Sequence, residues 1–290
     1  MKINSINNLT QTSFNGKMKN RGSIRAALTA SAVGTVGTLI PIGFTMIDSK
    51  INKSLSPKEV RKINTYADEL IKSTGLDKKG VQIVDVSNYD GHLLDNSLPN
   101  WLREVNDPIQ AAAKGKNAFF CLEDVINPAN GEILYAKNSI LVNREKAPLA
   151  ILHELGHAHN KNYSNLTDAR SSLKTPLSLL NTATNTVAIF GRSYEPQAGT
   201  KLNVLQNSSN FIRKNAGLFA AGTHIGNTVE ELTANAKANK WAKGLDKNIA
   251  KKVKASNLAG TFTYLTTPMV AGLAVHAAVK VKDSIMGKRK

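Results

Sequence analysis

Two long stretches of the chain lack charged residues, and they bracket a middle segment with a changing hydrophobic pattern. Residues 26–47 and 255–279 contain no Asp, Glu, Lys or Arg. As a helix, each is long enough to cross the roughly 30 Å hydrocarbon layer of a membrane. We therefore predict a transmembrane helix over each stretch, with a disordered basic tail at 1–25 and a second basic tail at 280–290. A buried helix of a soluble core is the alternative for either stretch.

The middle segment alternates between helical and extended patterns, which is typical of an α+β domain. Ser56-Pro57-Lys58-Glu59 matches a capping box with proline at the first helical position, and apolar residues at helical spacing follow it as far as Gly75. Short strands are predicted over 81–86, 117–122, 132–135 and 139–142, with a turn at 128–131. The predicted domain covers residues 48–254.

Two shorter apolar stretches lie inside this domain, at 175–191 and 215–229. Each is short for a membrane span and includes Asn or Thr. They predict either a hairpin that dips into the bilayer or helices packed on the core, and periodicity does not separate the two. We treat 175–229 as an apolar insertion in the domain.

The pentapeptide His153-Glu154-Leu155-Gly156-His157 is the strongest chemical signal in the chain. On a helix, the two histidines lie one turn apart on the same face, where they can hold one Zn²⁺. Glu154 can then act as general base on a zinc-bound water. Asn160 and Tyr163 stand where a metzincin has Gly and His, so a third ligand is expected elsewhere.

The best candidate for the third ligand is Glu231. The segment from Thr228 to Asn235 is predicted to open a helix, which places Asn235 one turn beyond Glu231 on the same face. Thr228 and Glu231 also fit a capping box, which would use the Glu231 carboxylate on the backbone instead. Glu230 is the alternative ligand.

Two other histidines are not assigned to the metal. His159 follows His157 by two residues, so it points away from the metal face and is predicted to face solvent. His224 lies close in sequence to the Glu231 helix, and a transition-state donor is often a His, Tyr or Arg. A polar residue within an apolar hairpin is the simpler interpretation of His224, so it is given no catalytic role.

The composition of the chain limits the kinds of partner that it is expected to bind. The net charge is +17 and the pI is near 9.9, but no nucleic-acid recognition motif accompanies this charge. We therefore predict attraction to anionic lipid headgroups and no nucleic-acid partner. The single cysteine, Cys121, cannot form an intramolecular disulfide, and its apolar surroundings in sequence predict a buried, inert thiol.

These motifs together resemble a known family. The ordered pair H-E-L-G-H and Glu231-Leu232-Thr233-Ala234-Asn235 resembles the H-E-x-x-H … E-x-x-A-D signature of the HtpX-like and CAAX-prenyl-protease membrane gluzincins. Asn117-Ala118-Phe119 resembles the N-A-F that opens their active-site hairpin, and Ser139–Asn143 resembles their edge strand. The chain departs from the family at Asn235, where Asp is usual. It also has one clear N-terminal apolar run where HtpX-like proteins have two.

The resemblance implies a zincin-like α+β domain in a bacterial inner membrane, with the domain facing the cytoplasm. One Zn²⁺ per chain would be held by His153, His157 and Glu231, and Asn235 would support a zinc-ligating histidine. A protein or peptide substrate would add to the edge of the predicted 139–143 strand. The implied substrate contacts are Asn117, Ala118, Ser139, Ile140 and Leu141.

The sequence thus predicts a membrane-associated, zinc-dependent endopeptidase with Glu154 as general base. Two other hypotheses belong to different classes. One is an inactive membrane protein that keeps the zincin fold as a binding platform, and the intact Glu154 argues against it because a structural zinc site does not need that carboxylate. The other is a basic, secreted, membrane-active factor whose apolar ends insert into a target bilayer.

Overall fold

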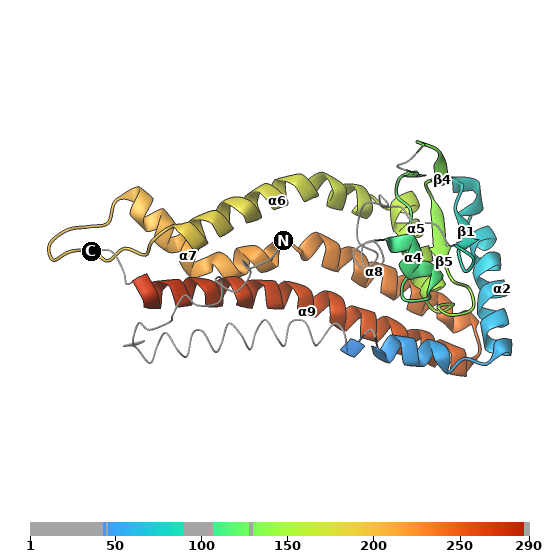
Figure 1. The fold of residues 1–290 in the computed structure, drawn as a ribbon. Helices are drawn as coiled ribbons and strands as arrows, with labels where there is room; N and C mark the ends of the chain where they lie inside the picture. The colour runs from blue at the N-terminus through green and yellow to red at the C-terminus, as the bar shows by residue number, and fades with distance from the viewer. Residues whose placement is uncertain (1–42, 45, 90–106, 128–129, 287–290) are drawn as a thin grey trace, which may run out of the picture.

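The computed structural model describes residues 43–44, 46–89, 107–127 and 130–286. Most of the predicted helix at 26–47 and the whole tail at 1–25 lie outside these residues. The described chain is a mixed α+β structure that is mostly helical (Figure 1). We call the described residues within 46–163 and 225–254 the head, which contains all the strands of the described chain. We call residues 166–222 and 255–286 the arm, which is helical apart from the connection between two of its helices.

Helix α2 (Pro57–Ser73) forms as its sequence predicts. The Ser56 backbone N–H donates to Glu59 Oε2 at 2.8 Å, and the Glu59 N–H donates to Ser56 Oγ at 3.3 Å, which completes the capping box. Its apolar side buries Ile63, Ala67, Leu70 and Ile71 against the head core. Gly75 follows the helix with φ of 71°, a conformation that glycine adopts without strain.

The central sheet has three strands in the order β1-β5-β2. Strand β5 (Ser139–Val142) pairs in parallel with β1 (Gln82–Asp85) and antiparallel with β2 (Phe119–Phe120). A separate hairpin joins β3 (Val125–Ile126) to β4 (Ile133–Tyr135). The predicted strands are therefore present, and β3 is one that the sequence pattern did not reveal. Part of the predicted turn, residues 128–129, lies outside the described residues.

The order of the strands corrects one prediction. Strand β5 is the middle strand of its sheet, and all four of its residues are buried. Its backbone pairs with a strand on each side, so Ser139, Ile140 and Leu141 have no free edge to offer a substrate. The edge beside the H-E-L-G-H helix belongs instead to β2, which Asn117 and Ala118 precede.

Two helices cross at the centre of the head. Helix α5 (Ala150–Tyr163) carries the H-E-L-G-H motif and packs against α8 (Ile225–Trp241). A Cβ added at Gly156 would lie 2.6 Å from the Ala234 carbonyl oxygen, so only glycine permits this approach. The contact places the two histidines opposite Glu231 and Asn235. The remaining elements among the described residues of the head are a helical segment at 46–53, η1 (Asp77–Lys79), α4 (Pro108–Ala113) and η2 (Ala242–Gly244).

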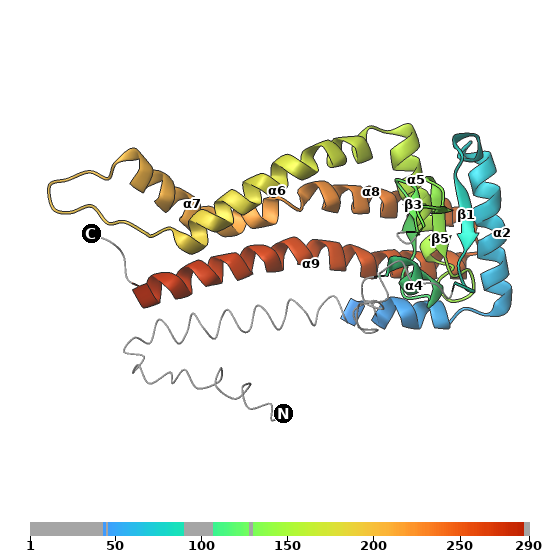
Figure 2. The same cartoon turned by 45° about the horizontal axis from the view of Figure 1, so that its top comes forward.

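The apolar insertion forms two long helices rather than a loop. Helices α6 (Leu166–Phe190) and α7 (Val204–Gly222) run beside α9 (Lys247–Met286) in both views of the molecule (Figures 1 and 2). A Cβ on Gly217 of α7 would lie 2.5 Å from the Gly272 carbonyl oxygen of α9, so these backbones touch. The predicted helix at 255–279 is the middle of α9, and the predicted tail at 280–290 begins inside the same helix.

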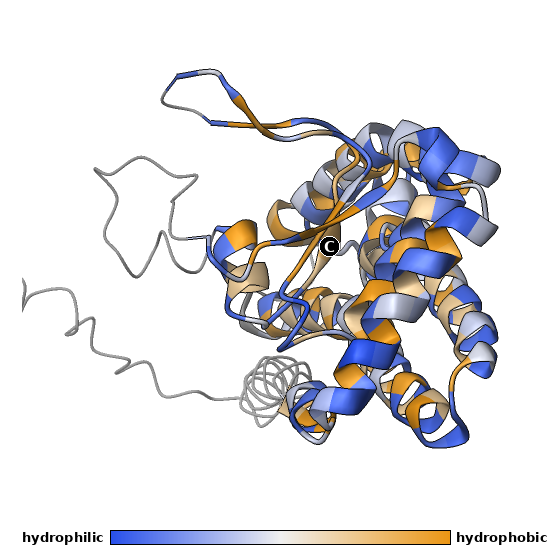
Figure 3. Cartoon of the chain, turned by 90° about the vertical axis from the view of Figure 1, so that its right-hand side faces the viewer, coloured by the Kyte–Doolittle hydropathy of each residue, from blue (hydrophilic) through white to orange (hydrophobic). Residues whose placement is uncertain are grey.

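The arm exposes many large apolar side chains. They lie on α6, α7, the arm part of α9 and the first residue of α8: Leu173, Leu179, Leu180, Ile189, Phe190, Val204, Leu205, Phe211, Leu218, Ile225, Leu258, Phe262, Leu265, Met269 and Leu273. Among the described residues, α9 is the one helix long and apolar enough to cross a membrane, and little of it is buried. Viewed along the arm from the head, the strands are largely hydrophobic and the helices mix both kinds of residue (Figure 3).

A buried charge holds the far end of the arm together. Arg213 of α7 is 2% exposed, pairs with Asp283 of α9, and donates to the carbonyl oxygens of Ala188 and Gly191 at the end of α6. These carbonyls have no partner within their own helix, because they belong to its last turn. One guanidinium therefore joins three helices at the same level.

Candidate metal centre

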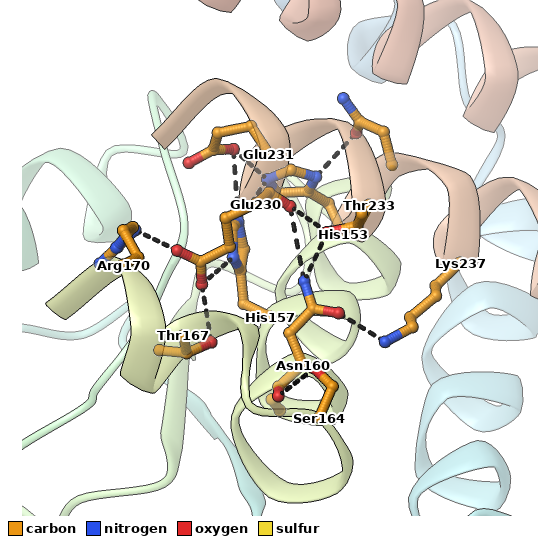
Figure 4. A network of polar contacts seen from close by, with 12 residues as sticks. His153, His157, Asn160, Ser164, Thr167, Arg170, Glu230, Glu231, Thr233 and Lys237 are labelled. Atoms are coloured by element: carbon orange, nitrogen blue, oxygen red, sulfur yellow. Dashed lines mark hydrogen bonds and ion pairs between the residues drawn. The ribbon is translucent and has the colours of Figure 1, made fainter. Parts of the chain in front are cut away.

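The two histidines of α5 converge on one point. His153 Nε2 and His157 Nε2 lie 3.0 Å apart, on the side of α5 that faces α8 (Figure 4). Their side chains are 12% and 10% exposed, so the pair is nearly sealed from solvent. The one-turn spacing that the sequence predicted for a shared ligand is present in the structure.

Glu231 completes the cluster. Its Oε2 atom lies 3.1 Å from His153 Nε2 and 3.3 Å from His157 Nε2. This oxygen is buried and accepts no well-oriented hydrogen bond from the described residues, although two ring nitrogens stand against it. The ligand atoms of the three residues lie within 4.8 Å of one another. Two imidazoles and one carboxylate are a donor set that suits Zn²⁺, and a metal ion would satisfy the unpartnered oxygen.

The alternatives for Glu231 do not hold. Helix α8 begins at Ile225, so Thr228 lies inside the helix, where its hydroxyl donates to the His224 carbonyl at 3.0 Å. The capping box of Thr228 and Glu231 is therefore wrong. The residue types fit a capping box, but the N-cap of α8 is His224, four residues earlier than the pattern predicted.

Asn235 fixes the orientation of His153. The His153 Nδ1 atom lies 2.7 Å from Asn235 Oδ1, and the Asn235 amide donates to the Asn257 carbonyl at 3.3 Å and to Thr261 Oγ1 at 3.0 Å. Because the amide nitrogen is used on α9, the amide oxygen faces His153 and accepts its Nδ1–H. The Nε2 lone pair of His153 then points at the cluster, as a metal ligand requires.

Glu230 supports His157 in the same way. Its Oε1 atom lies 3.3 Å from His157 Nδ1 and accepts a hydrogen bond from Thr167 Oγ1 at 3.0 Å, while its Oε2 atom pairs with Arg170. Glu230 thus meets the ring nitrogen that points away from the cluster. The prediction of Glu230 as an alternative ligand is therefore wrong, and Arg170 and Thr167 at the start of α6 are partners that sequence reasoning missed.

Asn160 braces the two helices beside this network (Figure 4). Its side-chain amide donates to Thr233 Oγ1 at 3.0 Å, and its oxygen accepts from Lys237 Nζ at 2.5 Å. At the position where a metzincin would have glycine, this chain therefore has a residue that links α5 to α8. The link helps to keep Glu231 opposite the histidines.

The carboxylates around the two histidines favour a positive charge in the cluster. Burial lowers the pKa of His157, but the Glu230 and Glu231 carboxylates outweigh it and raise that pKa to about 10. Burial raises the pKa of Glu231, yet the two histidines overcome this and hold it well below its usual range. Without a metal, a proton serves as the cation between these carboxylates, and a Zn²⁺ ion would replace it.

Glu154 lies on the strand side of α5. The carboxyl is buried, and burial raises its pKa, with both histidines opposing the shift. The backbone amide of Phe120 in β2 contacts the carboxylate. Cys121, which follows Phe120, is buried as predicted, and burial raises the pKa of its thiol to about 12.

A cavity of about 390 Å³ opens beside His153. Its walls include Asn117 from the residues that precede β2, Asn235 from α8, and Ser256, Asn257 and Tyr264 from α9. The predicted contact residue Asn117 therefore reaches the site, whereas Ala118 is buried. The α9 residues could not be found from sequence, because they lie in a stretch whose composition predicted a membrane span.

The two unassigned histidines stay outside the cluster. His159 is half-buried between the rings of Tyr163 and Trp241, at centroid distances of 4.9 and 5.8 Å, so the prediction that it faces solvent is wrong. Its ring fills a space between α5 and the end of α8. His224 is the residue that precedes α8.

Comparisons with protein-family models, with curated proteins and with solved structures found no match to this chain. The candidate metal centre is therefore defined by the geometry of its own residues.

Proposed function

We propose that the chain is a zinc-dependent endopeptidase with a zincin-like head. The observation that carries the proposal is the convergence of His153 Nε2, His157 Nε2 and Glu231 Oε2 on one point, with the Glu154 carboxylate next to them in the sequence. Three protein ligands leave one position for water or substrate, which is the pattern of a catalytic zinc and not of a structural one.

When bound, Zn²⁺ would acidify a water and polarise a peptide carbonyl. The protein supplies the proton transfers. Glu154 accepts the proton of the attacking water and passes it to the leaving amine, and burial, which raises its pKa, suits it to both steps. Asn235 and Glu230 keep the Nε2 lone pairs of His153 and His157 directed at the cluster.

An extended substrate fits the edge of β2 better than β5. Among the described residues, β2 has a partner strand on one side only, and its Phe120 amide contacts Glu154. A peptide that adds to this edge would place its backbone beside the general base. Asn117 leads into this strand and lines the cavity, so we keep it as a binding residue. Ala118 is buried, and Ser139, Ile140 and Leu141 have no free edge, so we do not assign these four residues to substrate binding.

The test of this function is metal analysis paired with proteolysis. Purified full-length protein should contain about one zinc per chain and should cleave an unfolded protein such as casein. A strong zinc chelator should stop the cleavage, and added Zn²⁺ should restore it, because two histidines and a carboxylate rebind the ion. Cleavage that persists without metal, or protein that takes up no zinc, would contradict the proposal.

We also propose that the arm enters a lipid bilayer. Its exposed apolar side chains lie on three adjacent helices, and the polar Arg213–Asp283 pair is kept inside the bundle. Apolar surface of this extent is costly in water and stable in hydrocarbon. The bacterial inner membrane and a cytoplasmic head are supported by the motif resemblance alone.

Alkaline carbonate should therefore leave the full-length protein in the membrane pellet. Helix α9 alone spans about 60 Å at 1.5 Å per residue, so it can cross the bilayer and still reach the head. Immunoblotting of the pellet and the supernatant measures the outcome. Quantitative release by carbonate would show that the arm is covered by protein and not by lipid.

A further inference from the structure

Tyr264 stands at the metal centre although it comes from the apolar helix α9. Its ring is parallel to the His153 ring, with an interplanar angle of 9° and a centroid distance of 6.2 Å. Its side chain contacts the Glu231 carboxylate, and it lines the cavity beside His153. The phenol therefore contacts Glu231 and lies beside the His153 ring, on the cavity side of the site.

We propose that the Tyr264 hydroxyl donates a hydrogen bond to the carbonyl oxygen of the scissile peptide bond as that oxygen gains negative charge. This inference rests on the proposed function. A phenol is both donor and acceptor, and its O–H can turn from one acceptor to another. In the resting site it faces Glu231, and a bound substrate in the cavity presents a second acceptor within the same region.

The surroundings favour this role over simple packing. A tyrosine in an apolar helix needs a hydrogen-bond partner, and its hydroxyl lies too far from its own backbone to find one there. The shorter side chains of Thr266 and Thr267 do donate within α9, to the carbonyls of Phe262 and Thr263 one turn earlier. Tyr264 instead extends across to α5 and α8, where its hydroxyl meets the ligand cluster.

The expected effect of removing the Tyr264 hydroxyl on kcat follows from the energetics of oxyanion stabilisation. A preorganised donor to a developing oxyanion contributes about 10²- to 10³-fold to kcat, because its contribution grows as the charge forms. The same donor adds little to binding of the neutral ground state. Tyr264→Phe should therefore lower kcat by about 100-fold and change KM by less than about threefold. Zinc content should stay at the wild-type level.

The experiment compares Tyr264→Phe with Thr267→Val, which also removes one hydroxyl from α9. Calorimetry on the zinc-loaded proteins measures the affinity for a phosphinic peptide, whose tetrahedral phosphorus carries a charged oxygen, and for the matching plain peptide. Tyr264→Phe should weaken the phosphinic peptide about as much as it lowers kcat and leave the plain peptide unchanged. Thr267→Val should change neither.

Three results would overturn the proposal for Tyr264. Unchanged kcat and phosphinic affinity in Tyr264→Phe would show that the hydroxyl is not a donor to substrate. Loss of zinc in that variant would show that Tyr264 positions Glu231 instead. A kcat loss of the expected size in Lys116→Met, with none in Tyr264→Phe, would assign the donor to another residue of the cavity wall.

Failure of the proposed function can be distinguished from failure of the role of Tyr264. If wild-type protein neither binds zinc nor cleaves peptide, both proposals fall together. If the wild type is active and Tyr264→Phe is equally active, only the role of Tyr264 falls. Should Tyr264→Phe fold poorly by circular dichroism, Tyr264→His keeps a ring with an N–H donor, and it should retain more activity than a variant with Leu at this position.

Discussion

Replacing Glu154 with Gln should abolish nearly all peptide hydrolysis and leave both the bound zinc and the fold in place. The amide has almost the same shape as the carboxylate, but it cannot accept the proton of the attacking water. We expect kcat to fall by about 10²- to 10⁴-fold, the range that general acid–base catalysis contributes. Glu154 is buried and is not among the three converging ligands, so the loss should be purely catalytic.

The measurement is a peptide-cleavage rate on protein whose zinc content is assayed in the same sample. Glu69→Gln is the matched control, because it makes the same chemical change at an exposed position of α2. The control should retain full activity. Turnover near the wild-type rate in Glu154→Gln would show that another group is the base, or that a contaminating protease produced the signal.

Removal of one ligand should have the largest effect on metal binding. His157→Ala leaves one imidazole and one carboxylate, which is too few to hold zinc against competition at ordinary concentrations. Residues that hydrogen-bond to a metal ligand, as Asn235 and Glu230 do here, typically contribute about 10- to 100-fold to metal affinity, and this range can be compared with the loss of a ligand. His157→Ala and His153→Ala should exceed that range, and Glu231→Gln should also weaken zinc sharply, since a neutral amide is a poor ligand.

A competition titration with a zinc-binding dye would rank these variants. Glu230→Gln and Asn235→Ala should fall between the wild type and the ligand variants, because Asn235→Ala removes the hydrogen bond that orients His153 and Glu230→Gln removes the negative charge that strengthens the one to His157. Full zinc occupancy in His157→Ala would remove that residue from the site. Tighter binding in Glu231→Gln than in Glu230→Gln would transfer the ligand role to Glu230.

The local parts of the fold follow from the sequence. The α2 capping box, the strand that follows the 128–131 turn, and the helical spacing of His153 and His157 each depend on residues that are near neighbours along the chain. The mixed α+β class and the shared face of the two histidines could therefore be predicted, because they need no knowledge of how distant segments meet. Glu231 lies more than seventy residues further along the chain, and the motif resemblance singled it out.

The parts that could not be predicted depend on tertiary contacts. Strand β5 looks like an edge strand in sequence, but β1, from more than fifty residues earlier, pairs with its second side. Asn235 in place of Asp looked like a weaker support for histidine. The structure explains why an amide suits this position. The Asn235 amide donates to Thr261 on α9, and an ionised carboxylate has no hydrogen to donate.

The path of α9 decides how the protein can be divided in the laboratory. The helix runs without a break from the head core, where Ile249 and Val253 are buried, past the metal centre and along the arm. A soluble fragment that ends before residue 255 would lose the α9 partners of Asn235, along with Tyr264. Shortening the 166–222 hairpin would cost Thr167 and Arg170 unless the cut falls beyond them. Shortened versions of the protein should keep α9 whole and remove residues from the tip of the hairpin.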